Sequence, residues 1–193
     1  EPRGVIGIIS PWNFPLLIPF GDAFTALFAG NAVVIKPSEH APLIALKVKE
    51  LWDASGHDPD LLQIVPGRGD TGQALIESGV QKIVFTGGVE TGRRVAASCG
   101  RALVECVLEL GGKAPALVCE DANLELAARA ITFAGFLNAG QACISVERVL
   151  AHEAIHDRLV ERIVHHAQRL RLGGPEGIWD VGPLIFPQQL ETV

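Results

Sequence analysis

Hydrophobic and polar positions follow two alternating patterns along the first part of the chain. Short β-branched runs are typical of buried strands, and stretches with an apolar residue every three or four positions are typical of helices. Together these patterns predict strands over 4–10, 32–35, 61–65, 82–86 and 101–110, and helices over 15–29, 42–55, 71–78 and 89–98. Five strands that alternate with helices predict an α/β fold, a doubly wound parallel sheet with helices on both faces.

The pattern starts again after Gly111 and Gly112. The second part predicts strands over 116–119 and 148–151, and helices over about 123–138 and 155–172. Asp121 or Asn123 is a good N-cap for the first of these helices, because a short polar side chain can bond to the free backbone N–H groups of a first turn. We therefore expect one domain over residues 1–111 and the first part of a second α/β domain over residues 112–193.

The amino-acid composition and net charge argue against some kinds of binding partner. The net charge of −6 argues against nucleic acid or an anionic membrane surface, both of which call for a basic patch. No apolar run reaches the ~18–20 residues of a membrane span. The nearest run, residues 15–30, carries Asp22 and is broken by Pro19 and Gly21.

Four cysteines are spread along the chain without a CxxC pair: Cys99, Cys106, Cys119 and Cys143. In a chain of this size without a signal peptide they indicate free thiols in a reducing compartment, and we expect a cytoplasmic protein. The chain contains no methionine and begins directly before a strand, so we expect that both ends are cut from a longer protein.

Two glycine-rich turns each join a predicted strand to a predicted helix. Residues 67–72 match G-x-G-x-x-G, the pattern of a dinucleotide-binding turn, although such turns also merely end strands. In the second turn, Gly87 and Gly88 precede a helix whose bare backbone N–H groups suit a pyrophosphate. Lys36 and Glu39 follow the second strand, where an acidic residue binds ribose hydroxyls in doubly wound folds; an exposed charge pair is the alternative.

Two residues are candidates for covalent and proton-transfer chemistry. Cys143 lies in a turn of small residues that would let a substrate approach the sulfur, although a lone cysteine is more often structural. The other three cysteines lie among apolar residues, and we expect them to be buried and inert. Glu109 is the one acid in the apolar run 107–110, and a buried carboxylate there would be a candidate general base. The alternative is that strand alternation points Glu109 into solvent.

The histidines show no metal-ligand spacing. His165 and His166 are adjacent on a predicted helix, point about 100° apart, and cannot share one metal ion. We therefore predict no metal site. The chain also lacks a G-x-S-x-G nucleophile motif.

Taken together, five motifs in order resemble the aldehyde dehydrogenase superfamily. The resemblance covers essentially the whole chain, although members of the family are more than twice as long. It rests on residues 10–15 (SPWNFP), 36–39 (KPSE), 85–87 (FTG), 108–113 (LELGGK) and 140–143 (GQAC).

The resemblance implies a mechanism and assigns residues to it. Cys143 would attack the aldehyde carbon as a thiolate, and the side-chain amide of Asn13 with the backbone N–H of Cys143 would stabilise the oxyanion, an effect worth ~3–4 kcal/mol. Hydride transfer to NAD, or to NADP, leaves a thioester, and Glu109 would activate the water that hydrolyses it.

The resemblance also implies a Rossmann-like cofactor domain. Lys36 and Glu39 would bind the adenine ribose, and Glu39 should favour NAD because it repels a 2′-phosphate. The family usually has Ser at the position of Gly88, so a hydroxyl contact to the pyrophosphate is missing here. The expected cofactor-binding residues are Trp12, Lys36, Glu39, Gly67, Thr86, Gly87, Gly88 and Leu110.

Three other functions compete with hydrolytic aldehyde oxidation. A CoA-acylating relative would hand the acyl group to CoA, but such relatives generally lack the base that Glu109 supplies. A catalytically silent relative would serve as a structural or binding protein, and a plain dinucleotide-binding module would leave Cys143 unexplained. The aldehyde is not evident from the sequence; we expect a small-molecule aldehyde and a homo-oligomer, dimer or tetramer, in the full-length protein.

Overall fold

The computed structural model describes residues 1–185 and 187–191, and it divides the chain into two compact units, Glu1–Leu110 and Gly111–Val193. Each unit has its own apolar core, so the two are described separately. The division lies one residue before the boundary expected from the sequence pattern. No helix in the described ranges is both long and apolar enough to cross a membrane.

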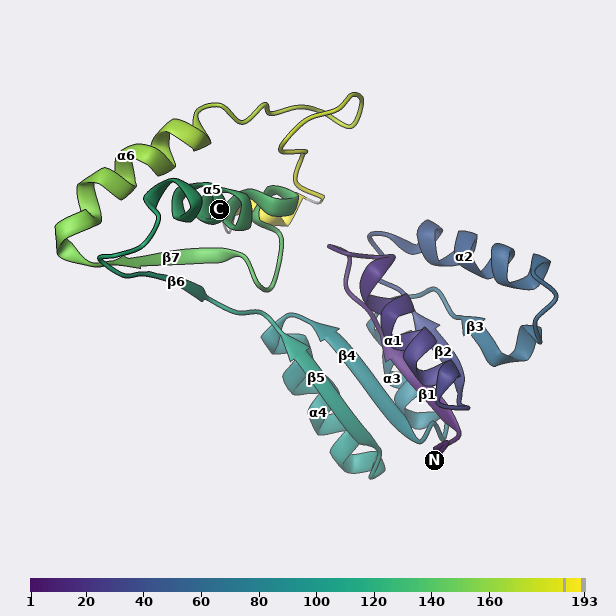
Figure 1. Ribbon diagram of the computed structural model, residues 1–193. Helices are drawn as coiled ribbons and strands as arrows, with labels where there is room; N and C mark the ends of the chain where they lie inside the picture. The colour runs from purple at the N-terminus through teal and green to yellow at the C-terminus, as the bar shows by residue number, and fades with distance from the viewer. Residues whose placement is uncertain (186, 192–193) are drawn as a thin grey trace. The chain divides into compact units, whose positions relative to one another are not determined.

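Unit 1 contains a five-stranded sheet in the order β3-β2-β1-β4-β5, in which every neighbouring pair is parallel (Figure 1). The parallel α/β sheet expected from the alternating pattern is therefore confirmed. The strands are β1 (Val5–Ile9), β2 (Ala32–Lys36), β3 (Leu62–Ile64), β4 (Lys82–Gly87) and β5 (Glu105–Leu110), and the helices are α1 (Leu17–Phe28), α2 (Pro42–Ala54), α3 (Gly69–Glu77) and α4 (Val89–Ala102).

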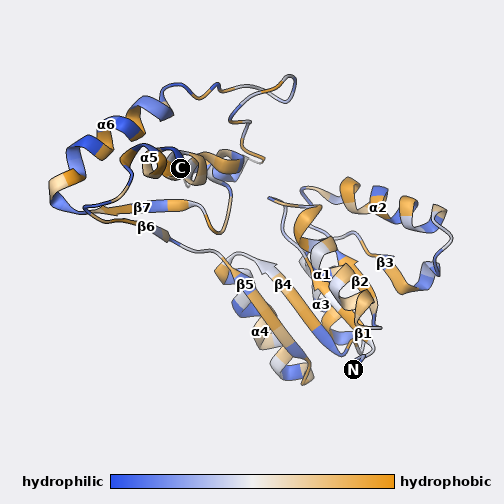
Figure 2. Ribbon diagram, viewed as in Figure 1, coloured by the Kyte–Doolittle hydropathy of each residue, from blue (hydrophilic) through white to orange (hydrophobic). Residues whose placement is uncertain are grey.

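Two apolar layers hold the helices on opposite faces of this sheet. On one face Ile6 and Ile8 of β1 pack with Phe20 of α1 and Ala45 of α2. On the other face Ile83 of β4 and neighbouring strand residues pack with α3 and α4. Figure 2 shows the apolar colouring that continues along the strands between these layers. Because successive strand side chains alternate between faces, each β-branched run supplies both layers.

Some predicted element ends differ from the structure. The sequence predicted a strand from residue 101, but α4 continues to Ala102 and β5 begins at Glu105. Leu103 ends the helix in the left-handed region (φ 56°), a conformation that leucine rarely adopts and that the apolar pattern of 101–110 conceals.

Unit 2 contains a two-stranded parallel sheet and two helices. Its strands are β6 (Ala114–Val118) and β7 (Val146–Ala151), and its helices are α5 (Leu124–Phe136) and α6 (His156–Ala167). The Asn123 side chain accepts a hydrogen bond from the Leu126 N–H and so caps α5, as one of the two predicted caps. Helix α6 ends earlier than the predicted residue 172, and the chain beyond it is tied by a bidentate Arg171–Asp180 ion pair.

Candidate cofactor pocket and catalytic residues

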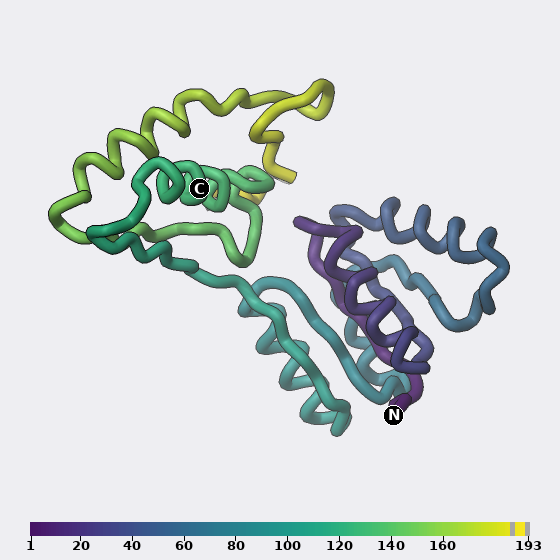
Figure 3. The backbone as a smooth tube through the Cα atoms, in the orientation of Figure 1, coloured from purple at the N-terminus to yellow at the C-terminus, as the bar shows by residue number. Residues whose placement is uncertain are grey.

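A pocket of about 480 Å³ lies at the carboxyl edge of the unit 1 sheet. From β1 the chain first adds β2 and β3 on one side of the sheet and then β4 and β5 on the other side. The strand order therefore reverses between β1 and β4, and in folds of this type ligands bind at the carboxyl edge beside such a switch point. Because β1, β2 and β4 are parallel, the chain leaves all three strands at the same edge of the sheet; Figure 3 traces the backbone of this unit. Residues that line the pocket include Ser10, Trp12, Lys36, Ser38, Glu39, His40, Arg68, Gly69, Gly72, Gln73, Thr86, Gly87, Gly88, Thr91 and Arg94.

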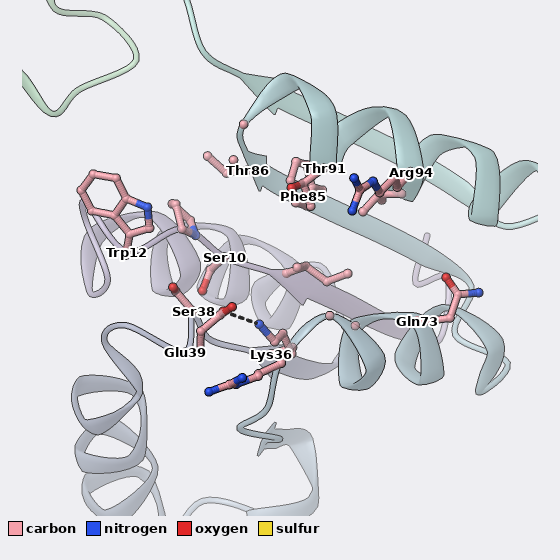
Figure 4. Close-up of a pocket in the computed structure, with 18 of the residues that line it drawn as sticks. Ser10, Trp12, Lys36, Ser38, Glu39, Gln73, Phe85, Thr86, Thr91 and Arg94 are labelled. Atoms are coloured by element: carbon pink, nitrogen blue, oxygen red, sulfur yellow. Dashed lines mark hydrogen bonds and ion pairs between the residues drawn. The ribbon is translucent and has the colours of Figure 1, made fainter. Parts of the chain in front are cut away.

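Lys36 and Glu39 form an ion pair at one side of this pocket (Figure 4), with 3.3 Å between Lys36 Nζ and Glu39 Oε2. The Lys36 side chain is 6% exposed and that of Glu39 is 43% exposed. Partial burial acts to raise the pKa of Glu39, but a hydrogen bond from its own backbone N–H and the Lys36 ammonium outweigh it and lower that pKa. The pair therefore presents a charged carboxylate acceptor beside a buried cation.

The turn after β4 brings bare backbone to the pocket. Gly88 is the N-cap of α4, so the first N–H groups of the helix face this end of the sheet. A Cβ at Gly87 would lie 2.6 Å from the Phe85 ring, which restricts the position to glycine. Thr86, Gly87 and Gly88 all line the pocket.

Two expected cofactor residues lie outside the pocket lining. Gly67 precedes α3 and packs against the Thr71 side chain, whereas its neighbours Arg68, Gly69 and Gly72 line the pocket. Leu110 packs against α4, where a Cβ at Gly92 would lie 2.5 Å from Leu110 Cδ2.

The expected cofactor-binding residues did not include several polar residues that line the pocket, notably Ser10, Ser38, Arg68 and Arg94. Ser10 and Ser38 belong to the motifs SPWNFP and KPSE, so their closeness in sequence to Trp12 and Lys36 was the available signal. Arg68 is the N-cap of α3, and Arg94 lies in the second turn of α4. Only the assembled strand order brings both to the lining of one pocket.

Asn13 and Glu109 both belong to unit 1. Asn13 lies in the loop between β1 and α1, half-buried, and its Oδ1 accepts a 3.1 Å hydrogen bond from the Phe14 N–H, which orients the amide. Glu109 lies near the carboxyl end of β5, paired in register with Thr86 of β4. Its side chain is exposed, so the expectation of a buried carboxylate is wrong. Alternation along β5 directs Leu108 and Leu110 toward α4 and Glu109 to the opposite face.

Cys143 lies in unit 2 on a turn with unusual backbone. Asn138, Ala139 and Gly140 are successive residues in the left-handed region, with φ of 54°, 59° and 74°. Such a run is costly for Asn and Ala, and it persists only where surrounding contacts fix it.

Two buried polar side chains provide those contacts. Gln141 Nε2 donates to the Asn138 carbonyl (2.8 Å) and its Oε1 accepts from the Ile185 N–H (3.0 Å). Ser145 Oγ donates to the Ala134 carbonyl (3.1 Å). Gln141 and Ser145 are 7% and 4% exposed, whereas Cys143 between them is exposed. The turn is therefore braced on both sides of an accessible thiol.

The glycine pair after β5 also bears on this turn. A Cβ at Gly112 would lie 2.8 Å from the Cys143 carbonyl oxygen, so glycine permits the two backbones to approach. Gly111, by contrast, has no atom within 4 Å of its Cβ position among the described residues.

The other cysteines do not all behave as expected. Cys99 is buried and Cys106 half-buried, but Cys119 is exposed, so the expectation that it is buried is wrong. Cys119 follows the last residue of β6 and lies beyond the apolar layer that the strand supplies. Exposure alone therefore does not single out Cys143.

The histidines of α6 take part in surface contacts. His166 Nε2 lies 3.0 Å from Glu125 Oε1, and His165 Nε2 lies 3.4 Å from Arg169 Nη1. Within the described ranges, no three His, Cys, Asp or Glu side chains gather into a group that could hold a metal ion.

Comparison with known proteins places these features in one family. A family model described as "Aldehyde dehydrogenase family" matches residues 1–193. A curated relative from Mycolicibacterium smegmatis, named putative succinate-semialdehyde dehydrogenase [NADP(+)], is 42% identical over the whole chain, which spans 38% of that protein.

Two solved structures are similar in backbone as well as in sequence. PnpE from Pseudomonas sp. WBC-3, in complex with nicotinamide adenine dinucleotide, is 42% identical with a TM-score of 0.95 and is matched over 100% of this chain and 40% of its own. A 3,6-anhydro-L-galactose dehydrogenase in complex with NADP is 34% identical with a TM-score of 0.93, over 98% of this chain and 40% of its own. The chain thus spans about two fifths of the length of these relatives.

Proposed function

The chain belongs to the aldehyde dehydrogenase family, and on that premise we propose that it carries the cofactor pocket and the reactive thiol of an enzyme that oxidises an aldehyde to a carboxylic acid with NAD(P). The observation that carries the proposal is the exposed Cys143 on a turn of three left-handed residues, braced by Gln141 and Ser145. Strained, over-determined backbone of this kind concentrates at functional sites.

The pocket in unit 1 fits a dinucleotide. The Glu39 carboxylate can accept hydrogen bonds from ribose hydroxyls, Lys36 supplies a cation beside it, and the backbone N–H groups at the start of α4 can receive phosphate oxygens. When bound, the cofactor supplies the hydride acceptor. Trp12 and Thr86 line the same pocket. Gly67 and Leu110 stay in the proposed cofactor-binding set on the strength of the family resemblance, although neither belongs to the lining of this pocket.

In the proposed reaction the Cys143 thiolate attacks the aldehyde carbon and forms a thiohemiacetal. The Asn13 amide nitrogen and the Cys143 backbone N–H donate to the oxyanion, which disperses its charge. After loss of hydride the acyl group remains on sulfur as a thioester. Glu109 takes a proton from water as the water attacks, and the acid and the free thiol are released.

Hydrolysis is favoured over transfer to CoA because Glu109 is present and accessible to water. Succinate semialdehyde is what the M. smegmatis relative is named for; an aldehyde of this small, soluble kind is the first substrate to assay. A homo-oligomer of the full-length protein is part of the proposal on the basis of the family alone.

The test substitutes the two exposed cysteines in turn. The assay uses a complete polypeptide in which this chain replaces the matching segment of PnpE. Cys143→Ala should abolish aldehyde-dependent NADH formation, whereas Cys119→Ala, an equally exposed thiol in the same unit, should leave the rate within about twofold. Full activity of Cys143→Ala, or equal loss in both variants, would remove Cys143 from the proposed role.

A further inference from the structure

A buried glutamine two residues before the thiol joins its turn to a segment far along the chain. Gln141 is 7% exposed, and its side-chain amide has partners in both segments. Nε2 donates to the Asn138 carbonyl at 2.8 Å, and Oε1 accepts from the Ile185 N–H at 3.0 Å, across 44 positions of sequence. The chain beyond α6 thus returns to the turn that follows α5 (Figure 1).

On the near side, Gln141 and Asn138 close the turn on itself. The Asn138 carbonyl accepts from the Gln141 backbone N–H at 3.2 Å as well as from the side chain, and Asn138 Nδ2 donates to the Gln141 carbonyl at 3.3 Å. These bonds hold Asn138 and Ala139 in left-handed conformations that are costly without such support. The turn that carries Cys143 therefore depends on where Gln141 is held.

On the far side, the amide meets a segment that is closed by its own contacts. The Arg171 side chain forms a bidentate ion pair with Asp180, at 2.9 Å and 3.1 Å, and the Arg171 carbonyl accepts from the Asp180 and Val181 N–H groups, at 3.0 Å and 3.2 Å. Hydrogen bonds from the Arg171 side chain and backbone lower the pKa of Asp180 to about 2, so the pair is charged at neutral pH. Ile185 therefore follows an anchored loop, residues 171–181.

The position of Gln141 favours a supporting role over direct contact with a substrate. Its side chain is buried, and both polar atoms of its amide bond within the protein. Loss of the amide would remove the acceptor that the Ile185 N–H uses and cut the link between the turn and the loop. Because a displacement of reacting groups by about 1 Å can cost ~100-fold in rate, this link bears on catalysis although the thiol itself stays intact.

We propose that Gln141 is a positioning residue that holds Cys143 by tying its turn to the loop closed by Arg171 and Asp180. The inference rests on the proposed role of Cys143 as the nucleophile. It extends the supporting structure of the thiol to residues beyond α6.

The test compares the first turnover with stability in the complete polypeptide. Gln141→Met keeps the length of the side chain and removes both of its hydrogen bonds. The matched control is Thr132→Val, an isosteric change at another buried polar residue of unit 2, whose hydroxyl donates to the Ala128 carbonyl within α5. The burst rate of NADH formation, the KM for NAD and the melting temperature are measured for each variant.

Gln141→Met should lower the burst rate about tenfold or more, because the thiol is no longer held in its reactive position. The KM for NAD should stay within about twofold of the parent value, because the cofactor pocket lies in unit 1. Thr132→Val should keep a burst rate within about twofold of the parent, whatever its melting temperature.

A second variant cuts the link at its far end without touching the turn. Asp180→Ala, at an exposed side chain, should lower the burst rate about threefold or more. Glu125→Ala, which removes the exposed ion pair with Arg162 elsewhere in unit 2, should not. When both changes are combined, the link is already cut by Gln141→Met, so the double variant should be no slower than Gln141→Met alone.

A parent-like burst rate in Gln141→Met, or an equal loss in Thr132→Val, would overturn the positioning role. A parent-like rate in Asp180→Ala, an equal loss in Glu125→Ala, or losses that multiply in the double variant, would overturn the link to the loop. NADH formation that survives Cys143→Ala would instead overturn the proposed function, a result separate from the other two.

Discussion

At the scale of single residues, Glu39 should decide which cofactor the pocket prefers. Its pKa is lowered by its own backbone N–H and by Lys36 against the opposing effect of partial burial, so it is ionised at neutral pH and repels a 2′-phosphate. We expect the parent chain to bind NAD more tightly than NADP, modestly because Lys36 attracts the phosphate. Glu39→Ser should shift the ratio of the two Kd values toward NADP by about tenfold, or ~1.4 kcal/mol.

The chain offers a matched control for this prediction. Lys47 and Glu50 on α2 form another pair of the same i,i+3 spacing, exposed to solvent and outside the pocket. Glu50→Ser should leave the ratio unchanged. Equal affinities of the parent chain for NAD and NADP, or the same shift in both variants, would contradict a role of Glu39 in cofactor choice.

Ionisation of Asp22 should destabilise the folded state. Partial burial on α1, and then the negative charge of Glu109, raise the pKa of Asp22. Both residues lie on the α1 face of the sheet, since Glu109 alternates away from the α4 layer. The raised pKa means that the folded state favours the protonated form of Asp22. Protonated Asp22 therefore adds stability to the fold below the unfolded pKa of about 4, and this added stability is lost as pH rises through the folded pKa.

Asp22→Asn should therefore raise the melting temperature at pH 7, by about 1–3 °C for a partly exposed group, and the gain should shrink as pH falls toward 4. Asp121→Asn, an exposed aspartate of unit 2, should show no such trend. A lower melting temperature of Asp22→Asn at pH 7 would show that the carboxylate is stabilising.

At the scale of elements, the two glycines after β5 should differ in importance. A Cβ at Gly112 would meet the Cys143 carbonyl at 2.8 Å, closer than real Cβ contacts allow, whereas one at Gly111 would meet nothing. Gly112→Ala should displace the turn at 138–146, and Gly111→Ala should not. The Ala142 and Ser145 N–H groups, bonded within this turn, report on it.

Hydrogen exchange measures the difference directly. We expect Gly112→Ala to speed exchange of the 138–146 peptide about tenfold or more, which corresponds to ~1.4 kcal/mol of lost protection, and Gly111→Ala to stay near the parent rate. Equal protection in both variants would mean that the turn does not depend on the close approach at Gly112.

The order and type of the elements could be predicted from the sequence because the apolar period differs between strands and helices. Where the prediction failed, local and tertiary contacts compete with the period. The run 101–110 is apolar enough to suggest one strand, yet its first residues complete α4 and Leu103 turns the chain in the left-handed region. Helix α6 stops at Ala167, short of the Arg171–Asp180 ion pair that holds the chain beyond it.

The candidate site was predictable where a motif fixes both residue type and position. Lys36, Glu39, Thr86 and Gly87 belong to such motifs, and all four line the pocket as expected. Arg68 and Arg94 were missed because only the assembled strand order brings both residues to the lining of one pocket. The burial of Glu109 and Cys119 was predicted wrongly because alternation and strand ends, rather than the apolar neighbours in sequence, decide exposure.

At the scale of the whole molecule, the 193 residues span about two fifths of the length of their relatives. Several large apolar side chains are exposed, including Phe28 at 90% and Leu103 at 92%. Loosely held catalytic groups can lose ~100-fold in rate through small displacements. We therefore expect the 193-residue chain to bind NAD but to oxidise aldehydes at least tenfold more slowly than the complete polypeptide. Comparable rates would show that the chain is sufficient for catalysis.

The central claim is that Cys143 carries the acyl group and Glu109 releases it, and trapping the thioester tests this claim most directly. In the complete polypeptide, Glu109→Gln is mixed with NAD and an aldehyde, NADH is followed in the first turnover, and the quenched protein is weighed by mass spectrometry. We predict one equivalent of NADH in a burst, an acyl adduct on the peptide that contains Cys143, and steady turnover lowered by about 100-fold or more. Turnover of Glu109→Gln at the parent rate with no adduct on Cys143 would contradict it.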